Sequence, residues 1–262
     1  GHKLTQRGCQ VLLARRLAMP IYTAAIPCAL CGADQDLFGD HAVACAVGGD
    51  RVGRHHRVRD TVAALCELAG HVPAVEKPDL LPLDPDDPPS AAATGRRPAD
   101  VYLPRWWEHR PACIDVTLPS VMLPSRIEQS AVDPSAHLRD YARRKREYLR
   151  TEDICRAAGM GFYPLVFDAD GGAGPEASRF LKDVYADIAK RGGAQPAVVT
   201  TRSRQRLSMA VQQANAAAMI RHRPPLPVFL APQQIAARAD VAAAAADATA
   251  QRAAAAAAAA AA

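Results

Sequence analysis

The sequence predicts an α/β protein, because segments with the apolar spacing of helices alternate with short apolar runs typical of strands. The helical spacing occurs over residues 4–17, 54–69, 136–158, 177–191 and 200–220. Strands are expected over residues 71–75, 100–103, 112–118 and 162–168. The resulting order is helix, strands, helix, strand, helix, helix, which is typical of a sheet flanked by helices.

The ends of these helices coincide with residues that interrupt helical structure. Pro20 follows the first helix, and Gly70 and Gly159 follow the second and third. In the second helix the apolar residues fall on one face: Val58, Val62, Leu65, Cys66 and Ala69. Residues 119–134 have neither spacing and are expected to be loop-like. The second helix therefore has an apolar face for a core, and the first three helices have defined ends.

Positive charge is concentrated in two segments of a chain whose net charge is +5. Residues 51–59 hold four arginines and two histidines, and residues 137–150 hold six basic against two acidic side chains. This distribution favours nucleic acid as a partner. No segment is apolar enough to span a membrane, and residues 1–20 do not read as a signal peptide. We therefore expect an intracellular or nuclear protein with no membrane partner.

Three of the seven cysteines and one histidine form the motif Cys-x2-Cys-x9-His-x3-Cys. Its residues are Cys28, Cys31, His41 and Cys45. Zn²⁺ prefers four such ligands in a tetrahedron, and four protein ligands leave no position for water, so we expect a structural zinc ion. Two alternatives remain: a set of buried free cysteines beside a surface histidine, or His55 or His56 in place of His41.

Acidic residues interrupt the expected strands. Asp115 lies between Ile114 and Val116, and Asp100 begins the preceding strand, while Asp79 follows Pro78. A carboxylate in an apolar strand is costly unless something binds it, and paired carboxylates bind the divalent ions that activate water. For Asp115 the alternative is a salt bridge to a nearby arginine. For Asp79 it is an ordinary turn.

The basic helix supplies a lysine that could act with these acids. Leu138, Tyr141, Lys145 and Tyr148 recur at helical spacing, which directs Lys145 toward the core. An inward lysine could orient the attacking water or stabilise charge on a transition state. The alternative is a lysine whose stem follows the apolar face while its amine reaches water.

The motifs together resemble the region of non-LTR retrotransposon polyproteins that lies between reverse transcriptase and endonuclease, and the endonuclease itself. The resemblance rests on the Cys/His motif, on Gly53 to His56, and on Pro98-Ala99-Asp100 followed after 14 residues by Asp115. It implies a CCHC zinc knuckle and a restriction-like endonuclease of the PD-(D/E)xK type. Thr117 occupies the position of the strand lysine, so Lys145 would be the lysine displaced onto the next helix.

The resemblance implies an endonuclease that nicks DNA at a target site. Asp100 and Asp115 would hold Mg²⁺ or Mn²⁺, and Lys145 would complete the catalytic set. An additional acid on the first helix would be Glu67, unless Glu67 is only a solvated residue at the helix end. Nucleic acid, DNA or RNA, is expected to contact five basic residues: Arg54, His55, Arg143, Arg144 and Arg146.

The expected organisation has four parts. Residues 1–20 form a linker helix, 21–53 the zinc knuckle, 54–222 the restriction-endonuclease-like domain, and 223–262 a tail rich in proline and alanine. We expect a retrotransposon-derived protein that lacks its reverse transcriptase, because the segment before Cys28 is too short for a polymerase palm. The alternative function is that of a decayed element copy whose zinc knuckle and arginines still bind nucleic acid without cutting it. A structural zinc protein with no nucleic-acid function is a third hypothesis.

Overall fold

The computed structural model describes residues 4–22, 24–81, 99–120, 127–133 and 135–223. Its described residues form two compact units. The first unit takes in the described residues of 4–54, 120–133 and 212–223, and the second takes in those of 55–119 and 135–211. The tail expected over residues 223–262 lies, except for Arg223, outside the described residues.

The first unit combines short helices with a two-stranded antiparallel sheet. Its complete elements are α1 (Gln6–Arg16), β1 (Ile26–Pro27), β2 (Asp34–Gln35), α2 (Asp40–Ala44) and α5 (Ile127–Val132). It also contains the start of α3 (Asp50–Leu68) and the end of α9 (Pro196–Arg221). α1 begins at the Thr5 cap, where the hydroxyl accepts a hydrogen bond from the Gly8 N–H.

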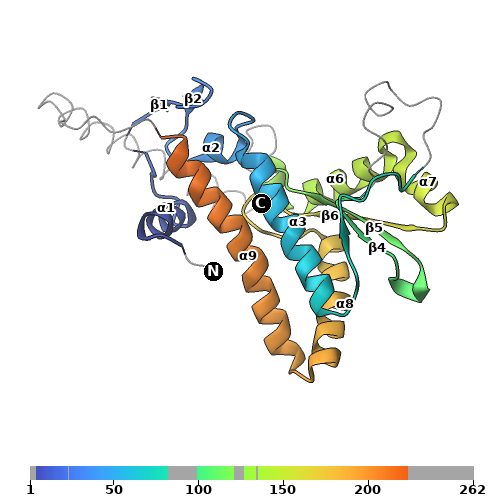
Figure 1. Cartoon of the computed structure of the whole chain (residues 1–262). Helices are drawn as coiled ribbons and strands as arrows, with labels where there is room; N and C mark the ends of the chain where they lie inside the picture. The colour runs from blue at the N-terminus through green and yellow to red at the C-terminus, as the bar shows by residue number, and fades with distance from the viewer. Residues whose placement is uncertain (1–3, 23, 82–98, 121–126, 134, 224–262) are drawn as a thin grey trace, which may run out of the picture. The chain divides into compact units, whose positions relative to one another are not determined.

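The second unit contains a four-stranded sheet in the order β3-β4-β5-β6 (Figure 1). The strands are β3 (Ala74–Val75), β4 (Val101–Leu103), β5 (Ala112–Thr117) and β6 (Gly161–Val166). β3, β4 and β5 pair antiparallel, and β5 pairs parallel with β6. The sheet is therefore mixed, with β5 in its interior.

Helices cover both faces of this sheet. On one face the core joins α3 and α8 (Pro175–Gly192) to Ile114 and Val116 of β5 and Leu165 of β6. On the other face, α6 (Ala136–Glu147) packs its Leu138 and Ala142 against β6, while Cys155 of α7 (Thr151–Ala157) packs near Cys113. The expected α/β class, a sheet flanked by helices, is confirmed, and the sheet is mixed.

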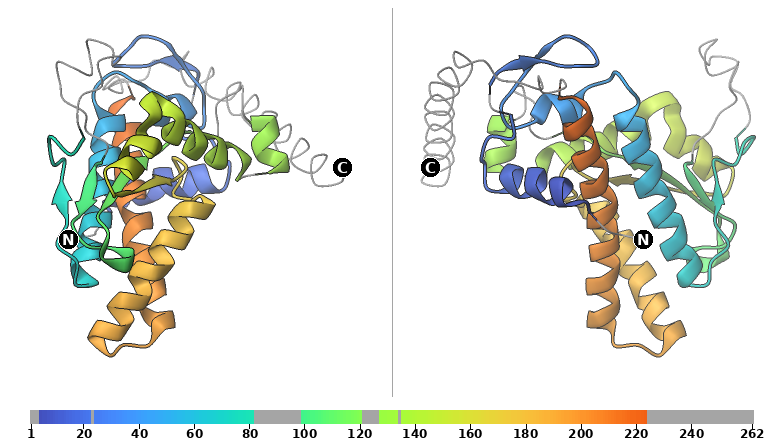
Figure 2. Two further views of the ribbon diagram at one scale, coloured as in Figure 1. Left: turned by 90° about the vertical axis from the view of Figure 1, so that its right-hand side faces the viewer. Right: turned by 60° about the vertical axis from the view of Figure 1, so that its left-hand side comes forward.

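α8 and the part of α9 that belongs to the second unit run side by side as a helical hairpin (Figure 2). Phe180, Leu181 and Val184 of α8 and Leu207 and Val211 of α9 belong to the same buried cluster. Gly193 ends α8 with a φ of 59°, a left-handed conformation that glycine adopts without steric cost. The two expected C-terminal helices are thus confirmed and extended by a few residues at their ends.

The prediction of one continuous basic helix over residues 136–158 is wrong. α6 ends at Glu147, a 3-10 turn η2 (Tyr148–Arg150) follows, and α7 begins at Thr151. Leu149 and Arg150 have φ values of 48° and 54°, which a continuous helix does not allow. The Thr-Glu-Asp sequence at the start of α7 is typical of a helix start, since acidic residues favour the first turn.

Other expected elements differ in extent. α3 begins at Asp50, four residues before its expected start, and a second short 3-10 turn η1 (Trp107–His109) precedes β5. β3 is only the last two residues of the expected strand. α5 was not expected, because its six residues are too few for a periodic pattern to be recognised.

The core of the second unit depends on the apolar residues of β5. Ile114 is fully buried in its central strand. We predict that Ile114→Ala lowers the free energy of unfolding by about 2–5 kcal/mol, because a cavity replaces packed methyl groups. Denaturant unfolding followed by tryptophan fluorescence measures this, since Trp106 packs against Phe180. Val72→Ala, at a position that is 74% exposed, should change it by less than about 0.5 kcal/mol; equal effects would contradict the assigned core.

Candidate metal centre and acidic site

The first two cysteines of the motif lie in the turn between β1 and β2. Gly32, which follows Cys31, has a φ of 75°, and this left-handed residue allows the chain to turn back tightly. The Gly32 N–H donates to the Cys28 carbonyl, and the Cys28 N–H donates to the Ala33 carbonyl. These bonds hold the two thiols on one side of the turn.

The other two residues of the motif are carried by α2. His41 lies in its first turn, and Cys45 is the residue that ends it. The Asp36 carboxylate accepts hydrogen bonds from the backbone N–H groups of Phe38, Asp40 and His41. A carboxylate at this helix end satisfies N–H groups that have no partner within the helix. This arrangement fixes α2 relative to the turn that carries Cys28.

The ligand atoms of Cys28, Cys31, His41 and Cys45 all lie within 4.8 Å of one another. Cys31 Sγ is 3.3 Å from His41 Nε2. Among the described residues, these four side chains form a group that could hold a metal ion. Three sulfurs and one imidazole nitrogen are a donor set that suits structural zinc, as the sequence predicts.

The surroundings of the cluster favour the thiolate at two of its cysteines. At Cys28, burial opposes ionisation, but N–H groups of the turn and the His222 ring outweigh it and lower the pKa of the thiol. At Cys31, the Ala33 N–H lowers the pKa of the thiol. Burial raises the pKa of Cys45. Because the thiolate is the form that ligates metal, the lowered pKa values of Cys28 and Cys31 favour metal binding in this turn.

The two acids singled out in the sequence lie on neighbouring strands of the second unit. Asp100 directly precedes β4, and its N–H donates to the Ile114 carbonyl at 2.9 Å. Its Oδ2 accepts the Val116 N–H at 2.6 Å. Asp115 lies between these two partners on β5. The antiparallel register of β4 and β5 therefore brings Asp100 beside Asp115, as the nuclease interpretation requires.

Lys145 reaches the same place from α6. Its Nζ is 3.1 Å from Asp115 Oδ1, and the Thr117 hydroxyl donates to Asp115 Oδ2 at 3.1 Å. Burial raises the pKa of the Asp115 carboxyl; the Lys145 charge opposes this shift and the Asp100 charge adds to it. The structure thus brings together all three residues of the expected catalytic set. Tyr148, expected on the same helical face, is 65% exposed because α6 ends before it.

α3 contributes a histidine to this acidic site, and Glu67 lies elsewhere. His55 Nε2 is 3.2 Å from Asp100 Oδ1, and this hydrogen bond raises the pKa of the His55 ring. Glu67 is exposed, and it lies twelve residues further along the helix, a rise of about 18 Å. The expected additional acid is therefore not near Asp100. Asp79 is exposed in a left-handed turn with a φ of 54°, which agrees with the turn alternative.

The basic residues expected to contact nucleic acid differ in their exposure. Arg143 and Arg144 are exposed and pair with Asp140 on the same helix. Arg146 is partly buried and binds both oxygens of Glu176 at 2.6 Å. Exposed ion pairs are weak and readily exchange for phosphate, whereas the paired guanidinium of Arg146 is already engaged by a carboxylate.

Arg54 was predicted wrongly as a nucleic-acid contact. It is only 2% exposed, and its guanidinium donates at 3.0 Å to the Val43 carbonyl and at 3.0 Å to Asn215 Oδ1. Its charge is therefore satisfied inside the first unit and is not available to a phosphate. His55, also expected to contact nucleic acid, is partly exposed, and its Nε2 lies 3.2 Å from Asp100 Oδ1.

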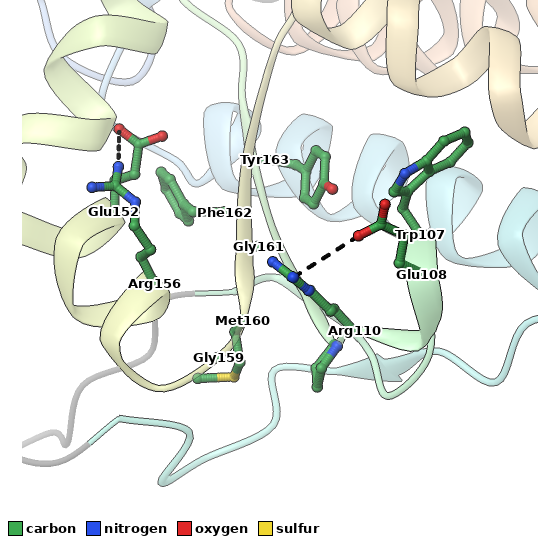
Figure 3. A pocket seen from close by; sticks show the side chains of 11 residues that line it. Trp107, Glu108, Arg110, Glu152, Arg156, Gly159, Met160, Gly161, Phe162 and Tyr163 are labelled. Carbon is green, nitrogen blue, oxygen red and sulfur yellow. Dashed lines mark ion pairs between the residues drawn. The ribbon is translucent and has the colours of Figure 1, made fainter.

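A separate hollow of about 430 Å³ opens where β5 and β6 begin (Figure 3). Its lining includes Trp107, Tyr163, Arg110 and Arg156. Each arginine pairs with a glutamate of the same hollow, so the charges compensate one another. None of Asp100, Asp115 and Lys145 lines it. The hollow is thus distinct from the acidic site.

Comparison with known proteins adds no relative. No model of a known protein family matches the sequence, and no similar curated protein was found. Among the described residues, no helix has both the length and the apolar character needed to cross a membrane.

We predict that the stability of the fold depends on the metal bound at this candidate centre. Chelation of the metal should lower the melting temperature of the full chain, and Cys31→Ser should reduce bound zinc from one ion per chain toward zero, because a tetrahedral site loses a ligand. Metal content and thermal unfolding measure both effects. Cys9→Ser, an exposed cysteine outside the cluster, is the matched control and should bind zinc as the native chain does. Equal zinc content in both variants would contradict the assigned ligands.

The pKa shift of the partly buried Asp115 predicts how stability depends on pH. Its pKa is higher in the folded than in the unfolded chain, so its protonated form stabilises the fold at low pH, and that stability is lost as pH rises. Above about pH 4, where an unfolded Asp ionises, the free energy of unfolding of Asp115→Asn should therefore increase relative to the native chain. Denaturant unfolding between pH 4 and pH 8 without added magnesium measures the difference. A decrease with rising pH would show that the Lys145 pairing outweighs burial.

Proposed function

We propose that the second unit is a restriction-like, metal-dependent endonuclease that nicks DNA, with Asp100, Asp115 and Lys145 as its catalytic set. The observation that carries the proposal is the convergence of these three residues from β4, β5 and α6, with Lys145 Nζ 3.1 Å from Asp115. A mixed sheet covered by helices on both faces is compatible with such a core. Fold alone does not carry function, so the proposal rests on the site.

The acidic site fits a hard divalent cation. Two carboxylates lie side by side, and the repulsion from Asp100 contributes to the raised pKa of Asp115, which a cation between them would relieve. Mg²⁺, or Mn²⁺ in its place, would be held by Asp100 and Asp115 and would activate water and stabilise charge on the phosphate. Lys145 would donate to the phosphate or orient the attacking water, and Thr117 and His55 would hold the two carboxylates in position.

We further propose that the chain derives from a non-LTR retrotransposon polyprotein, with the zinc knuckle and the exposed Arg143 and Arg144 contributing to the binding of DNA or RNA. The support is the Cys3His cluster in the first unit and the exposed arginines of α6 in the second. Phosphate contacts of this kind make affinity depend on salt. An enzyme that acts on genomic DNA would work in the nucleus.

A second candidate is a nucleic-acid-binding protein that no longer cuts. The observation that favours it is the pairing of both acids with basic side chains, Asp115 with Lys145 and Asp100 with His55. Thr117 also stands where the family's strand lysine would be. Such a protein would keep the zinc centre and the salt-dependent binding without the chemistry.

Nicking of supercoiled plasmid with Mg²⁺ separates the two candidates. Asp115→Asn should reduce nicking to background, because the cation loses a ligand, and Lys145→Ala should reduce it by about 10²–10³-fold through loss of one stabilising donor. Asp79→Asn, at an exposed acid outside the strands, is the matched control and should nick as the native chain does. Gel quantification of open-circular DNA measures the rates.

The outcomes of this experiment are distinct. Salt-dependent binding by a native chain that leaves the plasmid supercoiled would select the second candidate. Nicking that survives in Asp115→Asn would contradict the assigned acids. A native chain that shows neither binding nor nicking would rule out both functions and leave a structural zinc protein.

A further inference from the structure

A second histidine lies against the metal cluster of the first unit. His222, the residue after the end of α9, is completely buried. Its Nδ1 lies 3.0 Å from Cys28 Sγ, and its Nε2 lies 2.9 Å from Asp50 Oδ2. The imidazole is therefore held between the sulfur of a candidate metal ligand and a carboxylate. A carboxylate only accepts, so Nε2 donates to Asp50, and a ring that also donates from Nδ1 to the sulfur carries both hydrogens and a positive charge.

The backbone near His222 contacts the same part of the chain. The His222 carbonyl accepts hydrogen bonds from the Ala29 N–H at 3.2 Å and from Gln35 Nε2 at 2.6 Å. One turn earlier, the Met219 carbonyl accepts the Tyr22 hydroxyl at 2.9 Å. The last turn of α9 is thus attached to the segment that carries Cys28 and Cys31 through side-chain and backbone contacts.

His222 is surplus to the four ligands that zinc takes. Cys28, Cys31, His41 and Cys45 already form a closed set, and the Nε2 of His222 is engaged by Asp50. The His41 and His222 rings meet edge to face with centroids 6.3 Å apart, so they occupy different positions around the cluster. Buried groups that hydrogen-bond to a ligand fix its orientation and strengthen metal binding.

We propose that His222 is an outer-sphere residue of the metal site: it donates a hydrogen bond to the Cys28 sulfur, is oriented by Asp50, and makes the docking of the last turn of α9 depend on the bound metal. A metal-bound thiolate is a fixed acceptor for the Nδ1 hydrogen, whereas a free thiol can rotate away. The inference rests on the zinc part of the proposed function and is independent of the nuclease activity.

The test compares variants of the full chain in their affinity for zinc, measured by competition with a chromophoric chelator. His222→Leu should weaken zinc binding by about 10–100-fold, the usual cost of losing a partner of a metal ligand. His222→Asn keeps an amide N–H near the Nδ1 position and should recover most of that loss. Arg221→Ala removes a neighbouring contact to Asp50 without touching sulfur, and it should bind zinc as the native chain does.

Cobalt distinguishes an outer-sphere residue from a ligand. Co²⁺ in place of zinc reports its ligands through its visible absorption. His41→Ala, which removes a ligand, should shift these bands, whereas His222→Leu should leave their position unchanged. If His222→Leu shifts the bands and His41→Ala does not, His222 is the ligand and the proposal is wrong.

Amide hydrogen exchange tests the coupling to α9. In the native chain, chelation of the metal should speed exchange in residues 216–222. In His222→Leu these amides should exchange fast with and without metal. Native zinc affinity in His222→Leu, or exchange that ignores the metal in the native chain, would overturn the proposal.

Three further outcomes can be distinguished. If His222→Leu does not fold, Asp50→Ala carries the test, because it removes the acceptor of the Nε2 hydrogen without removing the ring and should weaken zinc binding more than Arg221→Ala does. If the native chain binds neither zinc nor cobalt, the zinc part of the proposed function fails together with this inference. If the native chain binds zinc and all His222 variants bind it equally, only this inference fails.

Discussion

The pairing of Asp100 with β5 is the interaction on which the acidic site depends. The Asp100 backbone bonds to Ile114 and its carboxylate bonds to the Val116 N–H, so both groups of one residue span Asp115. Side chains alternate along a strand, and a shift of one residue would turn Asp115 into the core and Ile114 out of it. The site is therefore specified by the same register that buries Ile114 and Val116 against α3 and α8.

This register also explains why Lys145 can reach the acids. Cys113, Asp115 and Thr117 share the face of β5 that is opposite Ile114, and that face is covered by α6 and α7. α6 packs Leu138 and Ala142 against Val166 of the neighbouring parallel strand, which fixes the helix over the sheet. Its last turn then carries Lys145 to Asp115. The hydrophobic packing of α6 therefore also determines where the charge of Lys145 lies.

The sequence predicts the local features of this arrangement but not those that depend on distant partners. Alternation within 112–118 predicts β5, and the charged residue within it marks Asp115. Helical spacing selects Lys145 from a run of basic residues. Arg54, in contrast, looks like a surface cation until Asn215, 161 residues away, accepts its hydrogen bond. His222 is 194 residues from Cys28, and no spacing rule relates them. Periodicity reports which face is buried and not what lies across it.

The two sites differ in how they contribute to the stability of the fold. The Cys3His cluster supplies four protein donors, so a metal there has no position left for a reacting water, and its removal should affect the fold. The acidic site supplies two carboxylates that repel one another, and such a pair lowers stability when nothing binds it. A partly buried ion pair like Asp115 with Lys145 can usually be replaced by apolar residues without loss of stability. We therefore do not assign this ion pair a large net contribution to the stability of the fold. The proposed cation between the two acids would relieve their repulsion, and the pairings with Lys145 and His55 relieve part of it without a metal.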